Sequence, residues 1–100
     1  MPLQSLTMLN DEFVAEHAGF FALRLQEHVG EDTERRIATA FRIALARPPS
    51  NDEAARCIAF LARQVELYRS NGVSGEAATH QALTELCHTL LNTSEFIYAE

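Results

Sequence analysis

The stretch from Phe41 to Glu53 constrains the fold of this chain more than any other part of the sequence. An apolar helical pattern runs there into a basic residue and two consecutive prolines. Because a proline disfavours helical geometry at the residue before it, a helix should stop at Arg47, just before Pro48. Ser50 and Glu53 then have the spacing of a reciprocal capping box, which starts a new helix. The stretch therefore predicts two consecutive helices joined by a short corner.

Similar start and stop signals divide the rest of the chain into helices. Asn10 and either Asp32 or Thr33 are favourable N-cap residues, Gly30 suits a left-handed C-cap position, and Asn71-Gly72 is a stop signal. Apolar residues recur at three- and four-residue spacing, and no stretch alternates as a strand would. The expected helical segments cover about 3–9, 11–29, 33–47, 51–70, 75–91 and 94–98.

These segments predict an all-α fold, a small bundle of four main helices with short helical terminal segments. The connections are two to five residues long, so consecutive helices should be mostly antiparallel neighbours. One hundred residues is the size of one domain, so residues 1–100 are expected to form a single helical domain, a piece of a larger protein. Gly19 lies inside a predicted helix, where a close helix–helix approach is the usual reason for a glycine. The predicted core draws mainly on Phe21, Leu25, Ile37, Phe41, Leu45, Ile58, Leu61, Val65, Leu83, Leu86, Leu90 and Phe96.

The charge balance excludes some classes of partner. The chain has 14 acidic residues against eight basic ones, all of them arginine, and a net charge of −6. Nucleic-acid-binding domains instead gather basic residues on one face, so no nucleic-acid partner is expected. No apolar run approaches the ~20 residues of a membrane span. The residues alone do not indicate a compartment.

The two cysteines, Cys57 and Cys87, do not form a cofactor motif. Neither belongs to a Cys-x-x-Cys pair or to the Cys-x-x-Cys-His motif of covalent haem attachment, and no cofactor is expected. Two buried free thiols are the expected state. The sequence leaves open whether they form a disulfide, which would require their Cα atoms to lie within about 7 Å.

The histidines and the paired carboxylates show no catalytic or metal-binding pattern. His80 and His88 are eight residues apart and His17 and His28 eleven, whereas two metal ligands on one helix face are three or four apart. His17 is expected at the edge of the core and the other three histidines at the surface. The carboxylate pairs sit at predicted helix starts, where they stabilise the helix dipole. The sequence predicts no catalytic residue, no metal site and no enzyme, with the activity of a longer parent left open.

Three segments of the chain together resemble one bacterial family. Pro2–Val14, Phe41–Glu53 and Leu86–Tyr98 are similar, in this order, to segments of the C-terminal part of a planctomycete-specific domain of unknown function. That domain follows cytochrome-c-like domains in large exported proteins. The resemblance implies that the chain is the end of a longer polypeptide with an exported or envelope location. It implies no haem and no catalytic residue in this chain.

The chain departs from that family at two positions. Glu12 stands where the family usually has proline, and Ala46 stands where it has glycine. The alanine argues against a left-handed residue at the corner and suggests that the helix continues to Arg47.

The function expected from these observations is a non-catalytic helical module that packs against upstream domains of its parent or against another protein. The alternative is an accessory domain that completes a carbohydrate- or redox-related enzyme site with upstream domains. Self-association is a third possibility, and an exposed apolar patch near residues 3–13 and 96–98 would mark a missing neighbour. Capping and turn bonds also explain most of the polar positions that could belong to an interaction site or structural motif. These positions are Gln4, Asn10, Arg42, Arg47, Asn92 and Glu95.

Overall fold

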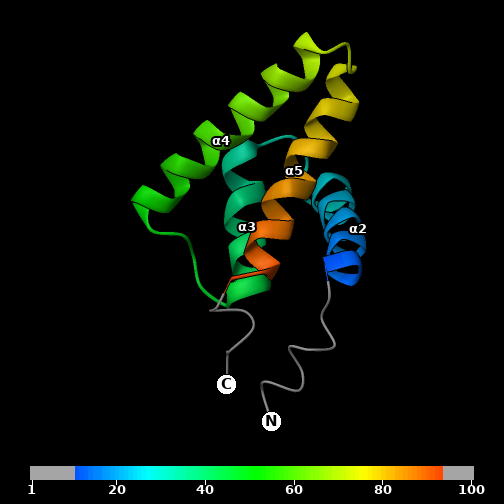
Figure 1. Ribbon diagram of the computed structural model, residues 1–100. Helices are drawn as coiled ribbons and strands as arrows, with labels where there is room; N and C mark the ends of the chain where they lie inside the picture. The colour runs from blue at the N-terminus through cyan, green and yellow to red at the C-terminus, as the bar shows by residue number, and fades with distance from the viewer. Residues whose placement is uncertain (1–10, 94–100) are drawn as a thin grey trace.

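The computed structural model describes residues 11–93, and this part of the chain is all-α, with four helices and no strand (Figure 1). The predicted fold class is confirmed. The segments predicted over 3–9 and 94–98 lie outside the described residues. The helices are α2 (Asp11–Val29), α3 (Thr33–Leu45), α4 (Asn51–Ser70) and α5 (Gly75–Leu91).

Local capping chemistry sets most of the helix ends. The Asp32 carboxylate accepts a hydrogen bond from the backbone N–H of Arg35 at 3.2 Å and starts α3. Both hydrogen bonds of the predicted capping box at the start of α4 are present. Gly30 and Gly72 have φ angles of 93° and 90°, a conformation that glycine adopts without steric cost. These stop signals are therefore confirmed.

The arrangement of the bundle is organised around α5, which contacts each of the other three helices. Its most extensive contact is with α2, although the two helices are far apart in the sequence. Fully buried alanines spaced four residues apart lie on both helices, Ala18 and Ala22 on α2 and Ala78 and Ala82 on α5. Such small side chains allow two helix backbones to approach closely. Figure 1 shows that α4 is inclined relative to α3, so that the N-terminal part of α4 diverges from α3.

The core agrees with most of the prediction. Phe21, Leu45 and Val65 are partly buried against it, Ile58 is 37% exposed, and Phe96 lies outside the described residues. The alanines of α2 and α5, together with Ala40, Ala44, Val14 and Cys87, complete the core. The predicted core residues that are buried are Leu25, Ile37, Phe41, Leu61, Leu83, Leu86 and Leu90.

The orientation of α2 differs from the expectation. Its buried stripe runs through Val14, Ala18, Ala22 and Leu25, whereas His17 is exposed. The prediction that His17 lies at the core edge is therefore wrong. The predicted close helix approach at Gly19 is wrong as well, because nothing lies within 4 Å of where a Cβ would be. Both errors have one cause, since α2 buries the stripe that contains Ala18 and Ala22, and this stripe excludes His17 and Gly19.

The corner after α3 also differs from the expectation. The helix ends at Leu45, and Ala46 adopts the left-handed conformation with φ 59° and ψ 31°. Its backbone N–H donates to the Arg42 carbonyl oxygen at 3.0 Å, which closes the last turn. The expected continuation of the helix to Arg47 is wrong. The chain must leave the helix before Pro48, and one left-handed residue achieves this whether or not it is glycine.

Replacing Ala46 with glycine should stabilise the fold. An L-residue in the left-handed region costs about 1–2 kcal/mol, while glycine loses about 0.5–1 kcal/mol in backbone entropy. We therefore expect Ala46→Gly to raise the free energy of unfolding by about 0.5–1 kcal/mol, measured by urea denaturation. The control is Ala59→Gly, at an exposed position inside α4, which should lower it by about 1 kcal/mol. A loss of stability in both variants would contradict the strain assigned to Ala46.

Candidate functional site

The corner between α3 and α4 holds a hydrogen-bonded ion pair that the sequence did not predict. The Arg47 guanidinium donates to both carboxylate oxygens of Glu53, at 2.8 and 3.0 Å, and to the Pro48 carbonyl oxygen at 3.0 Å. It also lies 5.6 Å from the centre of the Phe41 ring. Arg47 thus connects the start of α4 and the corner to the core residue Phe41. These contacts give Arg47 and Glu53 a structural role at the corner between α3 and α4.

Glu53 is the most strongly perturbed carboxylate of this corner. Its hydrogen bond from Arg47, followed by that from the backbone of Ser50, lowers its pKa from 4.5 to about 2. A carboxylate whose pKa is lowered by folding contributes stability above its unfolded pKa, and this contribution is lost as the pH falls toward the folded pKa. The contribution of Glu53 should therefore disappear between about pH 4.5 and pH 2.

We expect Glu53→Gln to lower the free energy of unfolding by about 1 kcal/mol at pH 7, because the ion pair is partly exposed to solvent. The difference from the parent chain should vanish near pH 2, measured by thermal unfolding across this range. Asp52→Asn is the control, because Asp52 and its partner Arg56 are highly exposed, with side-chain exposures of 80% and 72%. Its effect should stay below about 0.5 kcal/mol. A Glu53→Gln difference that is independent of pH would contradict the assignment.

The histidines do not assemble a metal centre. No group of three or more potential ligands from His, Cys, Asp and Glu occurs within residues 11–93. His80 Nδ1 lies 2.6 Å from the Gln26 side-chain oxygen and links α5 to α2. His88 is half-buried, and its Nε2 has no hydrogen-bond partner among the described residues. The expected exposure of His80 and His88 is therefore wrong, because both residues are half-buried.

The two cysteines are free thiols whose pKa values are raised by burial. Both thiols are free, so the disulfide that the sequence left open is not formed. Cys87 is fully buried, and burial raises its pKa to about 12. Burial also raises the pKa of the half-buried Cys57. The thiolate is the reactive form of cysteine, so a raised pKa lowers the reactivity of both thiols at neutral pH.

A polar cluster joins α4 to α5. The Glu85 carboxylate accepts hydrogen bonds from the Gln64 amide, at 2.7 Å, and from the Tyr68 hydroxyl. The hydrogen bond to Glu85 raises the pKa of Tyr68. Each side chain of the cluster has its partner within the cluster, so this arrangement positions α4 and leaves no reactive group.

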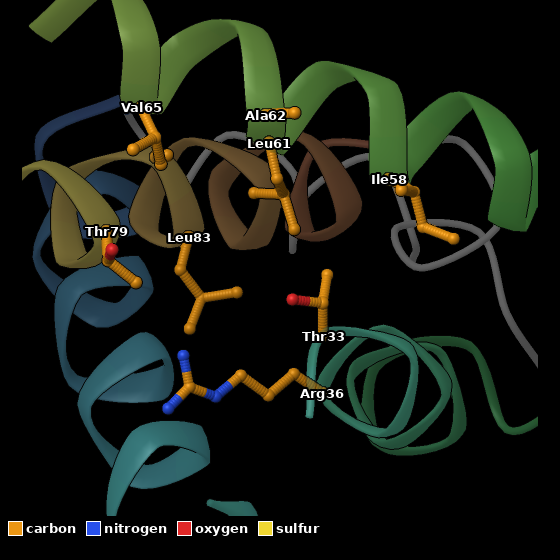
Figure 2. A pocket seen from close by; sticks show the side chains of 9 residues that line it. Thr33, Arg36, Ile58, Leu61, Ala62, Val65, Thr79 and Leu83 are labelled. Atoms are coloured by element: carbon orange, nitrogen blue, oxygen red, sulfur yellow. The ribbon is translucent and has the colours of Figure 1, made fainter. Parts of the chain in front are cut away.

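An apolar groove of about 280 Å³ lies between α3, α4 and α5. Figure 2 shows Leu61 and Val65 of α4 and Leu83 of α5 lining it, with Arg36 of α3 reaching along its other side. Two of its polar side chains make hydrogen bonds within the chain: Arg36 donates to the Gly30 carbonyl oxygen, and Thr79 donates to the Gly75 carbonyl oxygen at 2.9 Å. The groove lies where α3 and α4 diverge, and its lining is mainly apolar.

The other side of α4 borders a similar groove of about 290 Å³, lined in part by Phe60, Cys57 and Leu90. Leu61 is the one residue of α4 that is buried by the described part of the chain. The apolar side of α4 is thus buried at Leu61, and a solvent-accessible groove borders it on each side.

A larger groove, of about 640 Å³, lies between α2 and α3, and we call it the aromatic groove. It is lined by His17, Phe20, Phe21, Arg24, Leu25, His28, Val29, Thr39 and Ile43. Phe20 and Ile43 are 58% and 65% exposed.

The aromatic groove continues along α2 as a row of ring contacts. The His17 ring centre lies 4.2 Å from that of Phe13 and 6.3 Å from that of Phe20. Phe13 is itself 44% exposed. The large apolar side chains here therefore form one continuous surface rather than isolated exposures.

The structure does not gather the predicted interaction residues into one site. Gln4, Asn10 and Glu95 lie outside the described residues. Asn92 is exposed and is the C-cap of α5, where its backbone N–H donates to the His88 carbonyl oxygen at 3.1 Å. Arg42 is exposed on α3, one turn from Thr39 of the aromatic groove.

None of the helices within residues 11–93 has the length and apolar character that crossing a membrane requires. The described residues form an all-α domain with an exposed aromatic groove between α2 and α3.

Residues 1–61 match the family PSD1, described as "Protein of unknown function (DUF1553)", and the chain belongs to this family. The matched range includes Pro2–Val14 and Phe41–Glu53 and ends before Leu86. No curated protein and no solved structure gives a significant match to the chain.

Proposed function

We propose that this chain is a non-catalytic helical module that binds another polypeptide through the aromatic groove. The polypeptide belongs to a partner protein or to another domain of a longer, exported parent, as the resemblance to the planctomycete domain implies. One observation carries the proposal: Phe20 and Ile43, which both line the aromatic groove, expose 58% and 65% of their surfaces. Contiguous exposed apolar surface of this kind typically marks an interaction site.

The remaining chemistry supports a binding role rather than a catalytic one. The thiols are neutral, the corner ion pair is engaged in capping, and the polar cluster on α4 and α5 is internally satisfied. The aromatic groove, by contrast, presents mainly apolar and aromatic side chains. A module whose fold is held elsewhere can present such a surface without depending on it for stability.

The proposal is tested by photo-crosslinking in cells that naturally produce this protein. A photoreactive phenylalanine analogue at position 20 should form an adduct with another polypeptide, identified by mass spectrometry. The same analogue at Arg63, an exposed position on α4, should not form that adduct. Equal labelling at both positions would contradict the proposal. A cofactor that co-purifies with the chain in stoichiometric amount would also contradict it.

A further inference from the structure

The electrostatic character of the aromatic groove defines its partner more narrowly. Although the chain has 14 acidic residues and a net charge of −6, no carboxylate lines this groove. Its ionisable lining groups are the guanidinium of Arg24 and the imidazoles of His17 and His28. The nearest carboxylates on α2, Glu16 and Glu27, lie outside the lining.

Two further arginines lie beside the groove on α3. Arg35 and Ile43 each lie four residues from Thr39, so the three residues share one helix face, and Arg42 lies three residues from Thr39. Arg35 and Arg42 are exposed, as is Arg24 on the opposite side. Within residues 11–93 the guanidinium groups of all three have no ion-pair partner, whereas Arg47 and Arg56 are paired with carboxylates. The groove therefore combines an apolar floor with unpaired positive charge along its edges.

The dimensions of the groove suit a helix. Its lining on α2 extends from His17 to Val29, which corresponds to a length of about 18 Å, or slightly more than three turns. An apolar channel between two helices is the usual receptor for the apolar side of a third helix. The unpaired arginines would then face the flanks of that helix, where carboxylates would be complementary in charge.

We infer that the aromatic groove binds an amphipathic helix of a partner protein, with apolar residues against Phe20 and Ile43 and carboxylates toward Arg24, Arg35 and Arg42. This inference rests on the proposed function and names the chemistry of the partner. Binding should depend on both components, the apolar contact for affinity and the arginines for selection of acidic helices.

The test uses two labelled synthetic peptides of about 18 residues with the same leucine face, one flanked by glutamates and the other by lysines. Binding to the 100-residue chain is measured by fluorescence anisotropy at about 50 mM and 300 mM salt. The glutamate peptide should bind at least about tenfold more tightly than the lysine peptide, and the difference should shrink at high salt.

Charge-reversed and apolar variants separate the two components. The double variant Arg24→Glu/Arg35→Glu should abolish or invert the preference, whereas Arg63→Glu on α4 should leave it unchanged. Phe20→Ser should weaken the binding of the glutamate peptide by about tenfold or more. All four positions are exposed, and circular dichroism verifies that each variant is folded.

Several outcomes would overturn the inference. Equal binding of both peptides, or a charge reversal that has no effect, would reject the inferred preference for acidic helices. A crosslink at position 20 would in that case still support the proposed function. Binding to anionic lipid vesicles in place of the glutamate peptide would assign the surface to a membrane. A dimer seen by sedimentation and lost in Phe20→Ser would assign it to a second copy of the chain. Absence of both peptide binding and the crosslink would reject the inference and the proposed function together.

Discussion

Replacing Phe41 with alanine should lower the free energy of unfolding by about 3–5 kcal/mol. Phe41 is 3% exposed and belongs to the core formed by α2, α3 and α5. Removal of its ring would leave a cavity and would also release the guanidinium of Arg47, which lies over the ring. Small domains have total stabilities of about 5–15 kcal/mol, so the loss would be a large fraction. Urea denaturation monitored by far-UV circular dichroism measures it.

Phe20→Ala is the matched control for this substitution. The residue type is the same, but Phe20 is 58% exposed on α2. Its replacement should change the stability of the isolated chain by less than about 0.5–1 kcal/mol. If the two variants lost similar stability, the division between the core and the aromatic groove would be incorrect.

Replacing Ala82 with leucine should be the second most damaging change, at about 3 kcal/mol. Ala82 is fully buried on α5, the helix that packs most extensively against α2. Since Ala18 and Ala22 are also fully buried, the interface has no flexible side chain at these positions that could move aside. The added atoms would push the helices apart, and thermal unfolding would show a lower midpoint.

Ala77→Leu provides the comparison on the same helix. Ala77 is exposed, so a leucine there adds the same atoms without entering the interface. Its effect should be within about 0.5 kcal/mol of zero. Comparable destabilisation by both substitutions would show that α2 and α5 do not approach closely through their alanines.

Helix boundaries were predictable because their causes are local. The capping box of Ser50 and Glu53, the N-cap at Asp32 and the left-handed Gly30 all act through neighbouring backbone groups. The same local chemistry was misleading at Ala46. The absence of glycine indicated a longer helix, but the geometry required by Pro48 outweighs the steric cost at a single alanine.

Which side of a helix is buried was less predictable, because it depends on the neighbouring helix. On α2 a stripe through Phe13, His17 and Phe21 and a stripe through Val14, Ala18 and Ala22 both satisfy helical periodicity. Hydrophobicity favours the first stripe, whereas the structure buries the second. The choice depends on the small residues of α5, more than 50 residues away in the sequence.

The candidate site was missed for the same reason. The interaction residues expected from the sequence are all polar, whereas the groove is lined by apolar residues such as Phe20 and Ile43. Neither Phe20 nor Ile43 belongs to the predicted core. A large apolar residue that lies off the buried stripe of a helix is a signal for an interaction surface, but it can be recognised only once the stripe is known.

The limited anchoring of α4 has a consequence for its motions. This helix buries a single residue, Leu61, and its N-terminal half leans away from α3 (Figure 1). Its N-terminal end is held by the Arg47–Glu53 ion pair, and its C-terminal half is held by the polar cluster around Glu85. Both sets of hydrogen bonds are partly exposed to solvent. Local opening of α4 should therefore need less free energy than global unfolding, and its amide hydrogens should exchange with solvent sooner than those of α5. The bundle would thus behave as a stable α2–α5 pair carrying a helix that detaches and returns repeatedly during the lifetime of the folded state.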